Sequence, residues 1–195
     1  MQPGTSRDYG QGGFTLIEVL IAILVISVGL LATASLQLLS KRSNYDAAQR
    51  TTAAHLAGDL LERMRSNPAA LINYIPDGPL GGNTLGAPAT DCEGAGADCT
   101  AAELAAFDLW QWEQALDGAN ETQDGASAGG LISAQACITG APFGGNGIYT
   151  VAIAWRGMTD STNPATNSCG EGSGLFGDGD EFRRVLVVNS FINAG

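Results

Sequence analysis

The stretch GGFTLIEVL, residues 12–20, decides how this chain is organised, because it opens a long apolar run directly behind two glycines. From Val19 to Ser40, 22 residues lack an ionisable side chain, enough to cross a hydrocarbon core of about 30 Å as a helix. Between Phe14 and Leu39, 16 residues are Leu, Ile, Val or Phe. At roughly −0.3 to −0.6 kcal/mol each, they favour insertion by about 5 to 10 kcal/mol, and Glu18 costs a few kcal/mol at most. The sequence therefore predicts a transmembrane helix.

Three ordinary explanations compete for this segment: a secretory signal, a lipoprotein signal and a plain membrane anchor. A secretory signal has a basic start, a shorter apolar stretch and a small-residue cleavage site. Ala32-Thr33-Ala34 imitates the last feature, but Arg7 is offset by Asp8 and the run is long and carries a carboxylate. No cysteine follows the run closely enough for a lipoprotein. A plain single-pass anchor explains the length but gives no reason for Glu18 to follow a Gly-Phe junction by four residues.

The residues from Gly13 to Leu20 resemble the cleavage and methylation motif of type IV prepilins and pseudopilins. In that family a prepilin peptidase cuts after the glycine, here Gly13, and methylates the new terminal amine, here that of Phe14. The resemblance implies a leader of residues 1–13. It extends to about Arg65, and the stretch from Phe14 to Pro68 looks most like the PilV-type minor pilins. Beyond Pro68 only a general pattern of loops and late strands remains.

Glu18 has a physical reason to occur in this motif. A lone carboxylate in hydrocarbon is unfavourable, so Glu18 needs a cationic partner at similar depth. Cleavage after Gly13 creates a terminal amine, which is the nearest candidate. The resemblance implies that this glutamate pairs with the terminal amine of a neighbouring subunit. We therefore expect Glu18 to act in subunit assembly.

The orientation of the chain is a point where two signals disagree. Lys41, Arg42 and Arg50 follow the span, whereas the leader offers only Arg7. The positive-inside rule alone places the residues after the span in the cytoplasm. The processing motif implies the opposite, a single-pass inner-membrane protein with a periplasmic head that joins a pilus after assembly. We follow the motif.

Composition limits the functions open to the rest of the chain. A length of 195 residues, 45% of them hydrophobic, suits one anchored domain with a core of its own. The formal net charge of −11 repels nucleic acids and anionic lipid headgroups. Most of the 27 glycines come after Asp77, so turns and loops are expected there. We expect no nucleic-acid partner.

After Ser40 the pattern becomes that of an amphipathic helix that packs on a head. Its predicted buried face has a spacing of three or four residues: Tyr45, Ala48, Thr52, Leu56, Leu60 and Met64. Pro68 disfavours helix at Asn67, so one helix is predicted from Phe14 to about Ser66, roughly 80 Å long. The only histidine, His55, has Asp59 one turn away but too few other ligands for a metal site, and it leaves hydrolytic catalysis without a base.

The four cysteines, Cys92, Cys99, Cys137 and Cys169, contain no C-x-x-C pair, which argues against structural zinc. An even number in an exported head suggests disulfides, and four cysteines permit three connectivities. Sequence proximity favours Cys92 with Cys99, which leaves Cys137 with Cys169. Free buried thiols are the alternative.

The head is predicted as a long loop, a short helix and a sheet. Residues 75–100 read as a loop, and Thr100 to Leu116 as a helix with a Thr100–Glu103 capping box. Leu104, Phe107 and Trp110 are its expected core face, and a ligand platform of Trp110 and Trp112 is the less favoured alternative. Three later segments predict one antiparallel sheet covered by the stalk helix: Leu131 to Thr139, Ile148 to Arg156 and Phe182 to Ile192.

Two finer expectations concern this sheet and the turn before its last strand. Tyr149, Val151, Ile153 and Trp155 share one face of the middle strand, and Val185 to Val188 suggest a last strand buried on both sides. Gly177-Asp178-Gly179-Asp180-Glu181 gathers three carboxylates but lacks the twelve-residue pattern of an EF-hand, so we expect a solvated turn and not a Ca²⁺ site.

The expected fold class is α+β, a type IV pilin-like fold with a long N-terminal helix packed on a small antiparallel sheet. The domains expected are a leader (1–13), a transmembrane helix (14–40), the periplasmic half of the stalk helix (41–67) and a head (68–195). We expect a minor pilin that primes or joins type IV pilus assembly and serves twitching motility and adhesion. The alternatives are a type II secretion pseudopilin and, less favoured, a DNA-uptake pilin.

The partners implied are prepilin peptidase, other minor pilins, the major pilin, the inner membrane and a tip adhesin. No convergent acid, base, nucleophile or metal set is apparent in the sequence, so we expect neither an enzyme nor a cofactor.

Overall fold

The computed structural model describes residues 13–94, 96–119, 121–123, 126–127, 129–161 and 167–195. Most of the predicted leader, residues 1–12, therefore lies outside the described residues. The chain divides into two compact units, residues 1–43 and 44–195, and the division falls inside helix α1, Leu16–Ser66. The predicted long helix is confirmed; it begins two residues later than expected and ends before Asn67. In the first unit every described residue is exposed.

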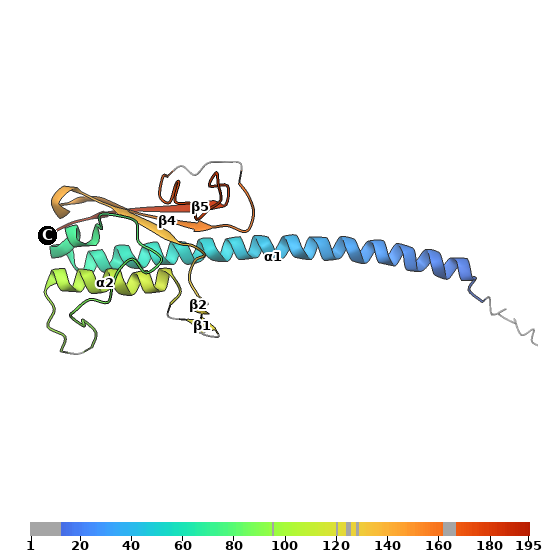
Figure 1. Ribbon diagram of the computed structural model, residues 1–195, viewed down its shortest axis with the longest axis horizontal. Helices are drawn as coiled ribbons and strands as arrows, with labels where there is room; N and C mark the ends of the chain where they lie inside the picture. Colours follow the sequence, from blue (N-terminus) through green and yellow to red (C-terminus); the bar gives the residue numbers. More distant parts are fainter. Residues whose placement is uncertain (1–12, 95, 120, 124–125, 128, 162–166) are drawn as a thin grey trace, which may run out of the picture. The chain divides into compact units, whose positions relative to one another are not determined.

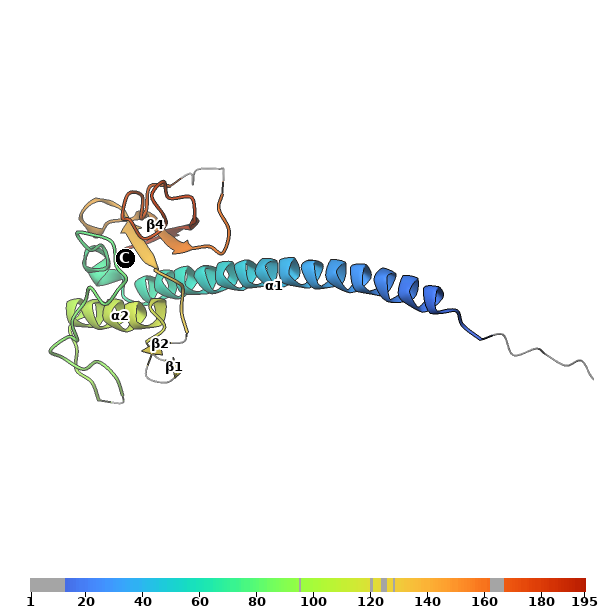
Figure 2. The same cartoon turned by 45° about the vertical axis from the view of Figure 1, so that its right-hand side comes forward.

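In the second unit, residues 44–195, α1 lies between a three-stranded sheet and helix α2, Ala101–Leu116 (Figures 1 and 2). The stripe of α1 that is buried there consists of Gln49, Ala53, Ala57, Leu60, Leu61 and Met64. Of the predicted face, Leu60 and Met64 are fully buried, whereas Ala48 is exposed. The predicted face is shifted around the helix from the observed one. Ala53 and Ala57 have small side chains that let other elements approach closely, but alanine is too weakly hydrophobic to mark a buried face in the sequence.

A short 3-10 helix, η1 (Pro68–Tyr74), follows α1 and was not predicted. Pro68 stands at its start, where the missing backbone N–H costs nothing. The buried Asn67 side chain joins this turn to the next helix, because its Nδ2 donates to the Ala101 carbonyl at 2.7 Å. The end of α1 is thus fixed by tertiary contacts as well as by proline.

The predicted helix of the head is confirmed as α2, and its capping box is present with both hydrogen bonds between Thr100 and Glu103. Its buried face differs from the prediction. The core contacts come from Ala105, Leu109, Trp112 and Leu116, whereas Leu104 and Trp110 are only half-buried. Of the predicted face Phe107 is buried, but residues spaced strictly by three drift around a helix with 3.6 residues per turn, which takes Leu104 and Trp110 off the core face.

The predicted sheet is also confirmed, as the antiparallel strands β3 (Gln135–Thr139), β4 (Gly147–Arg156) and β5 (Arg183–Ile192), with β4 in the centre. β3 begins four residues later than predicted, after a turn in which Ser133 has a φ of 50°. A further short hairpin pairs β1 (Thr122–Gln123) with β2 (Ala126–Ser127). A 3-10 turn, η2 (Pro142–Gly144), connects β3 to β4.

The two faces of this sheet have different cover. Tyr149, Val151, Ile153 and Trp155 share the face that packs in the main core with α1, as the alternation predicted. On the opposite face Ala152 and Ala154 form a smaller cluster with Cys169 and Phe176. The prediction that β5 is buried on both sides holds only in part, since Val185 packs against the outer cluster and Leu186 and Val188 pack against the main core. β5 is an edge strand, and the outer cluster ends before Val187 and Phe191, which are 37% and 65% exposed.

Candidate processing and assembly site

The start of α1 is built by Thr15. Its carbonyl accepts from the Glu18 and Val19 amides at 3.1 and 3.3 Å, and its Oγ1 accepts from the Glu18 amide at 3.3 Å. Thr15 therefore occupies the capping position and Glu18 the third position of the helix. A carboxylate in the first turn also interacts favourably with the positive end of the helix dipole. Local chemistry alone is enough to begin the helix directly behind Phe14.

Gly13 is not required by the fold of the chain. A Cβ built at this position meets no atom within 4 Å, and its backbone does not occupy the left-handed region. Phe14 is 84% exposed. By contrast, a Cβ on Gly81 in the head would lie 2.2 Å from the Ala134 carbonyl oxygen, so that glycine is needed internally. Nothing inside the described chain explains a glycine at position 13.

The Glu18 carboxylate has no partner among the described residues. Its side chain is exposed, and no ion pair or side-chain hydrogen bond joins its carboxylate to another described residue. The roles predicted for Gly13, Phe14 and Glu18 involve other proteins and not contacts within the described chain, so they remain predictions.

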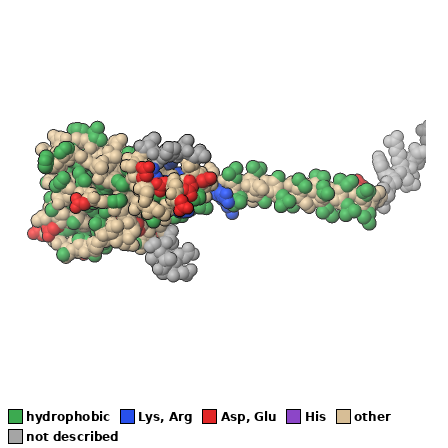
Figure 3. Space-filling model, turned by 45° about the horizontal axis from the view of Figure 1, so that its top comes forward, with side chains coloured by type: hydrophobic (Ala, Val, Ile, Leu, Met, Phe, Trp, Pro, Cys, Tyr) green, Lys and Arg blue, Asp and Glu red, His purple; other side chains and the backbone are tan. Residues whose placement is uncertain are grey.

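The first unit exposes a mainly apolar surface between Glu18 and Lys41. On the face that Figure 3 shows, hydrophobic side chains lie along this segment and no Lys or Arg side chain interrupts them, and in the sequence Lys41 and Arg42 come after the apolar run. An 18-residue window of α1 has a mean hydropathy of 2.7, enough for a membrane span. The hydroxyls of Ser27 and Ser35 donate to carbonyls one turn earlier, at 2.7 and 3.0 Å, so they need no water in hydrocarbon.

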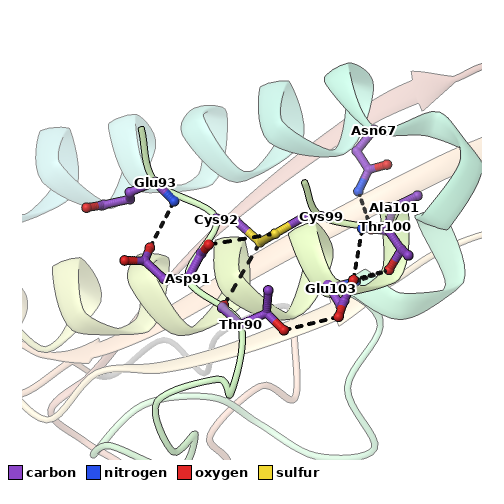
Figure 4. Close-up of a disulfide and its surroundings, with 9 residues drawn as sticks. All are labelled: Asn67, Thr90, Asp91, Cys92, Glu93, Cys99, Thr100, Ala101 and Glu103. Atoms are coloured by element: carbon purple, nitrogen blue, oxygen red, sulfur yellow. Dashed lines mark hydrogen bonds between the residues drawn. A yellow bond between two sulfur atoms is a disulfide. The ribbon is translucent and has the colours of Figure 1, made fainter. Parts of the chain in front are cut away.

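The structure pairs Cys92 with Cys99 and Cys137 with Cys169, which is the connectivity that the sequence favoured. The first disulfide clips the loop before α2 (Figure 4). In that loop Thr90 Oγ1 donates to Glu103 Oε1 at 3.1 Å, so the clipped segment is fastened to the start of α2. The second disulfide holds the segment 167–177 against the outer face of the sheet.

Two carboxylates of α2 organise the loop in a way that sequence reasoning missed. The Glu113 side chain is fully buried and accepts from the amides of Gly81, Thr84 and Leu85 at 2.7–2.8 Å. One turn later Asp117 accepts from the amides of Gly82 and Asn83 at 2.9 and 2.8 Å. The signal that could have found Glu113 is its place beside Trp112 on the apolar face of a helix.

The protonation of Glu113 follows from these contacts. Burial raises the pKa of its carboxyl, but hydrogen bonds from the Thr84 hydroxyl and from the loop amides outweigh burial and leave the pKa below its ordinary value. Glu113 is therefore ionised at neutral pH and holds the loop as a charged acceptor.

A second buried polar group connects α1, η1 and α2. Asp108 accepts from Arg63 Nη1 at 3.0 Å and from the Tyr74 hydroxyl, and Asn67 Nδ2 donates to that hydroxyl at 3.3 Å. Burial and the hydrogen bond to Asp108 raise the pKa of Tyr74 well above its ordinary range. These groups are mutually satisfied, so their arrangement stabilises the head and has no free group for chemistry.

The remaining candidate ligands are placed apart or engaged elsewhere. His55 is exposed, and Asp59, its neighbour one turn away, pairs with Arg63 at 3.0 Å. In the acidic turn, Asp180 and Glu181 accept from the amides of Gly172 and Gly179 at 2.8 and 3.0 Å. Within the described residues no three His, Cys, Asp or Glu side chains gather closely enough to hold a metal ion.

The two tryptophans do not form a joint platform. Trp112 is fully buried, and its Nε1 donates to the Leu56 carbonyl at 2.8 Å. Trp110 instead lines a shallow hollow of about 220 Å³ together with Phe107 and the loop residues Pro88 and Asp91. Packing therefore accounts for Trp112, and only Trp110 has a face toward solvent.

Comparisons with known families give two matches. The family described as type IV pilin Tt1218 matches residues 35–110, and the prokaryotic N-terminal methylation motif matches residues 9–34. No curated protein and no solved structure matches the chain. The methylation motif covers Gly13, Phe14 and Glu18, and the other match begins within the span and ends in α2.

Proposed function

We propose that this chain, a type IV pilin-like protein, is a minor pilin that primes or joins the assembly of a type IV pilus. The two family matches support the coarser part of this proposal, a pilin of a pilus or pseudopilus system. Pilins of this family are structural subunits and not enzymes. A single apolar helix anchors the chain in a membrane, as its length and composition indicate.

The proposal depends on one observation: the surroundings of Gly13 and Glu18 within the described chain explain neither residue. A glycine that the fold does not need, followed at a distance of five residues by a carboxylate without an internal partner, is explained if other proteins read both residues. Prepilin peptidase cuts after Gly13 and methylates the amine of Phe14. The carboxylate of Glu18 then pairs with the terminal amine of a neighbouring subunit, where low dielectric strengthens the attraction.

The proposed arrangement has a leader up to Gly13, a span at 14–40, a stalk at 41–67 and a head from Pro68 onward in the periplasm. The disulfides support this orientation, since they persist in the oxidising periplasm. The basic residues Lys41 and Arg42 oppose it under the positive-inside rule. Our proposal follows the processing motif for the orientation of the chain: prepilin peptidase removes a cytoplasmic leader, so the residues after the single span lie in the periplasm.

The assignment to a minor pilin rests on the sequence of α1. The stretch from Phe14 to Pro68 resembles the PilV type, and α1 lacks the proline that interrupts the membrane half of many major pilins. Its partners in this role are other minor pilins and the major pilin, with a tip adhesin as a further candidate. Twitching motility and adhesion are the activities that such a pilus supports.

A pseudopilin of type II secretion is the second candidate, because it has the same N-terminal motif. A DNA-uptake pilin is less favoured, since residues 44–195 contain 18 acidic and six basic residues and repel a phosphate backbone.

Deletion of the gene, with piliation, secretion and transformation scored separately and restored by complementation, tests the proposal. We expect loss or marked reduction of surface pili with secretion intact. Lost secretion with normal pili contradicts the proposal and favours the pseudopilin, and a defect confined to transformation favours the DNA-uptake pilin.

A further inference from the structure

The two edges of the head sheet differ in whether their outward-pointing backbone groups are hydrogen-bonded. The β3 edge is occupied by Leu80, whose amide donates to the Ala136 carbonyl at 2.8 Å and whose carbonyl accepts from the Ala136 amide at 2.8 Å. Gly81 follows so closely on Ala134 that no side chain fits between them. At Ala136 this edge is therefore already occupied by the chain itself.

The β5 edge has no such cover among the described residues. The Gly157 amide donates to the Phe182 carbonyl at 2.8 Å, which fixes the alternation of the β4–β5 ladder. The amides and carbonyls of Val187, Asn189 and Phe191 therefore point away from β4. In the described part of the chain, no hydrogen bond uses the amides of these three residues, and only the Phe191 carbonyl has a weak contact, with the Ser190 hydroxyl at 3.4 Å.

The residues of this edge also lack the usual protection. Exposed edges are normally guarded by charged side chains, proline or a bulge, whereas residues 185–192 read VLVVNSFI. Phe191 is 65% exposed and lies directly opposite Ile148, which is 64% exposed, on the outer face of the sheet. An apolar pair thus flanks a row of free backbone donors and acceptors.

We propose that the β5 edge binds an extended strand of a different pilin-like subunit, which continues the sheet and covers Phe191 and Ile148 with apolar side chains. Such strand addition gains affinity from backbone hydrogen bonds and selectivity from alternate side chains. This inference rests on the proposed function, because it names the surface through which the minor pilin meets its neighbour.

A second copy does not fit the β5 edge by antiparallel self-pairing. The end of the sheet where β5 begins lies near Asp46, whose carboxylate accepts from the Met158 amide at 3.3 Å. The end where β5 finishes lies near Arg65, which donates to the Ser190 hydroxyl. β5 and the head part of α1 therefore run in the same direction. Two-fold antiparallel pairing sets the Asn44 residues of the two copies at opposite ends of the joint sheet, about 30 Å apart for ten-residue strands. That pairing also reverses the direction of the head part of α1 between the two copies, whereas the subunits of the proposed filament are related head to tail and run in one direction, which opposes it.

Pairing of β5 with β3 of a second copy keeps both heads in the same direction, because β3 and β5 are each antiparallel to β4. It is blocked by Leu80, which already uses the free backbone groups of Ala136. The chain thus leaves the backbone groups of β5 free at one edge, whereas at the other edge those of Ala136 are already used. The partner is a chain with a free strand of its own.

The test uses the full-length protein in its own cells, with a benzophenone amino acid in place of Phe191. Irradiation is expected to give an adduct with another chain that has the N-terminal methylation motif, identified by mass spectrometry. Val187→Pro removes an amide that points away from β4, so the head should fold while the adduct falls at least tenfold. Val188→Pro is the matched control, because its amide belongs to the β4 ladder and its loss should lower the melting temperature of the head.

Three results overturn the inference: no adduct with a pilin-like chain, an adduct with a second copy, or an adduct that Val187→Pro leaves unchanged although the variant is folded. Leader removal and piliation are followed in the same strains. Normal piliation without the Phe191 adduct overturns the edge inference alone, whereas failure of the proposed function appears as normal pili in the deletion strain.

Discussion

The N-terminal unit and the head differ in where their unusual residues find partners. In the described part of residues 1–43, every residue is exposed, no steric contact requires a glycine at position 13, and the Glu18 carboxylate has no hydrogen-bond or ion-pair partner. In the head, Gly81 is required by the Ala134 carbonyl, and Glu113 by three loop amides. From this difference we expect substitutions in the head to lower the free energy of unfolding. Substitutions at Gly13 and Glu18 should instead change leader removal and assembly, which depend on other proteins.

The largest effect on the free energy of unfolding is expected from the Cys137–Cys169 disulfide, which closes a loop with a sequence separation of 32. Replacing both residues with Ala should cost about 4 kcal/mol by the loop-entropy relation. The pair Cys92 and Cys99, with a separation of seven, should cost about 2.5 kcal/mol by the same relation. Urea unfolding of the full chain in detergent measures both. Equal losses for the two pairs would contradict the loop-length account.

Glu113→Ala should come next, at about 3 kcal/mol, because each partly buried amide left unpaired costs about 1–3 kcal/mol and some regain water. The same urea series measures the loss. Asp98→Ala, an exposed acid of the same loop region, is the matched control and should stay within about 0.5 kcal/mol of the wild type. A loss no larger than that of the control would show that Glu113 does not hold the loop.

The pH dependence of this effect follows from the lowered pKa of Glu113. A carboxyl with a lowered folded-state pKa contributes stability that is present above its unfolded pKa of about 4.3 and is lost as the pH falls through the folded value. The stability advantage of the wild type over Glu113→Gln should therefore be constant from pH 7 to about pH 5 and shrink below about pH 4.3. Unfolding curves of both proteins across this range measure the advantage. An advantage that grows with acidity would reverse the assignment.

The local features of this fold could be predicted from the sequence, and the features that depend on distant contacts could not. The span, the capping box at Thr100 and the three strands of the sheet each follow from neighbouring residues. The buried face of α1 was misplaced because Ala53 and Ala57 matter only through the layers that pack against them. The exposure of Val187 depends on where the outer cover formed with Cys169 ends, which no pattern within β5 indicates.

The same distinction applies to the candidate site. The roles of Gly13, Phe14 and Glu18 could be predicted from the sequence because they belong to a linear motif, which needs no distant contact to be recognised, and they remain predictions. Glu113 was missed because its partners, the amides of residues 81–85, are backbone groups that any sequence supplies. Its signal was a carboxylate on the apolar face of α2, and that signal can be sought in other sequences.

Gly13→Leu should leave the free energy of unfolding unchanged, because a side chain at this position has open space. The leader should nevertheless stay attached, since the peptidase must draw a small-residue junction into its site. Mass spectrometry of the native chain measures this: the wild type should begin with methylated Phe14 and the variant should retain the leader. A wild-type chain that begins at Ser35 would instead indicate ordinary signal-peptidase cleavage after Ala34.

The central claim, that Glu18 serves a neighbouring subunit and not its own chain, is tested most directly by Glu18→Val. The change removes a charge from hydrocarbon, so membrane insertion should persist or improve, and the free energy of unfolding and leader removal should not change. Assembly should fail, because a terminal amine in low dielectric loses its partner. The measurement is the amount of the chain in sheared pili, relative to the amount in the membrane fraction, for the wild type and the variant in one strain. We predict at least a tenfold lower ratio for Glu18→Val, and an unchanged ratio would contradict the account.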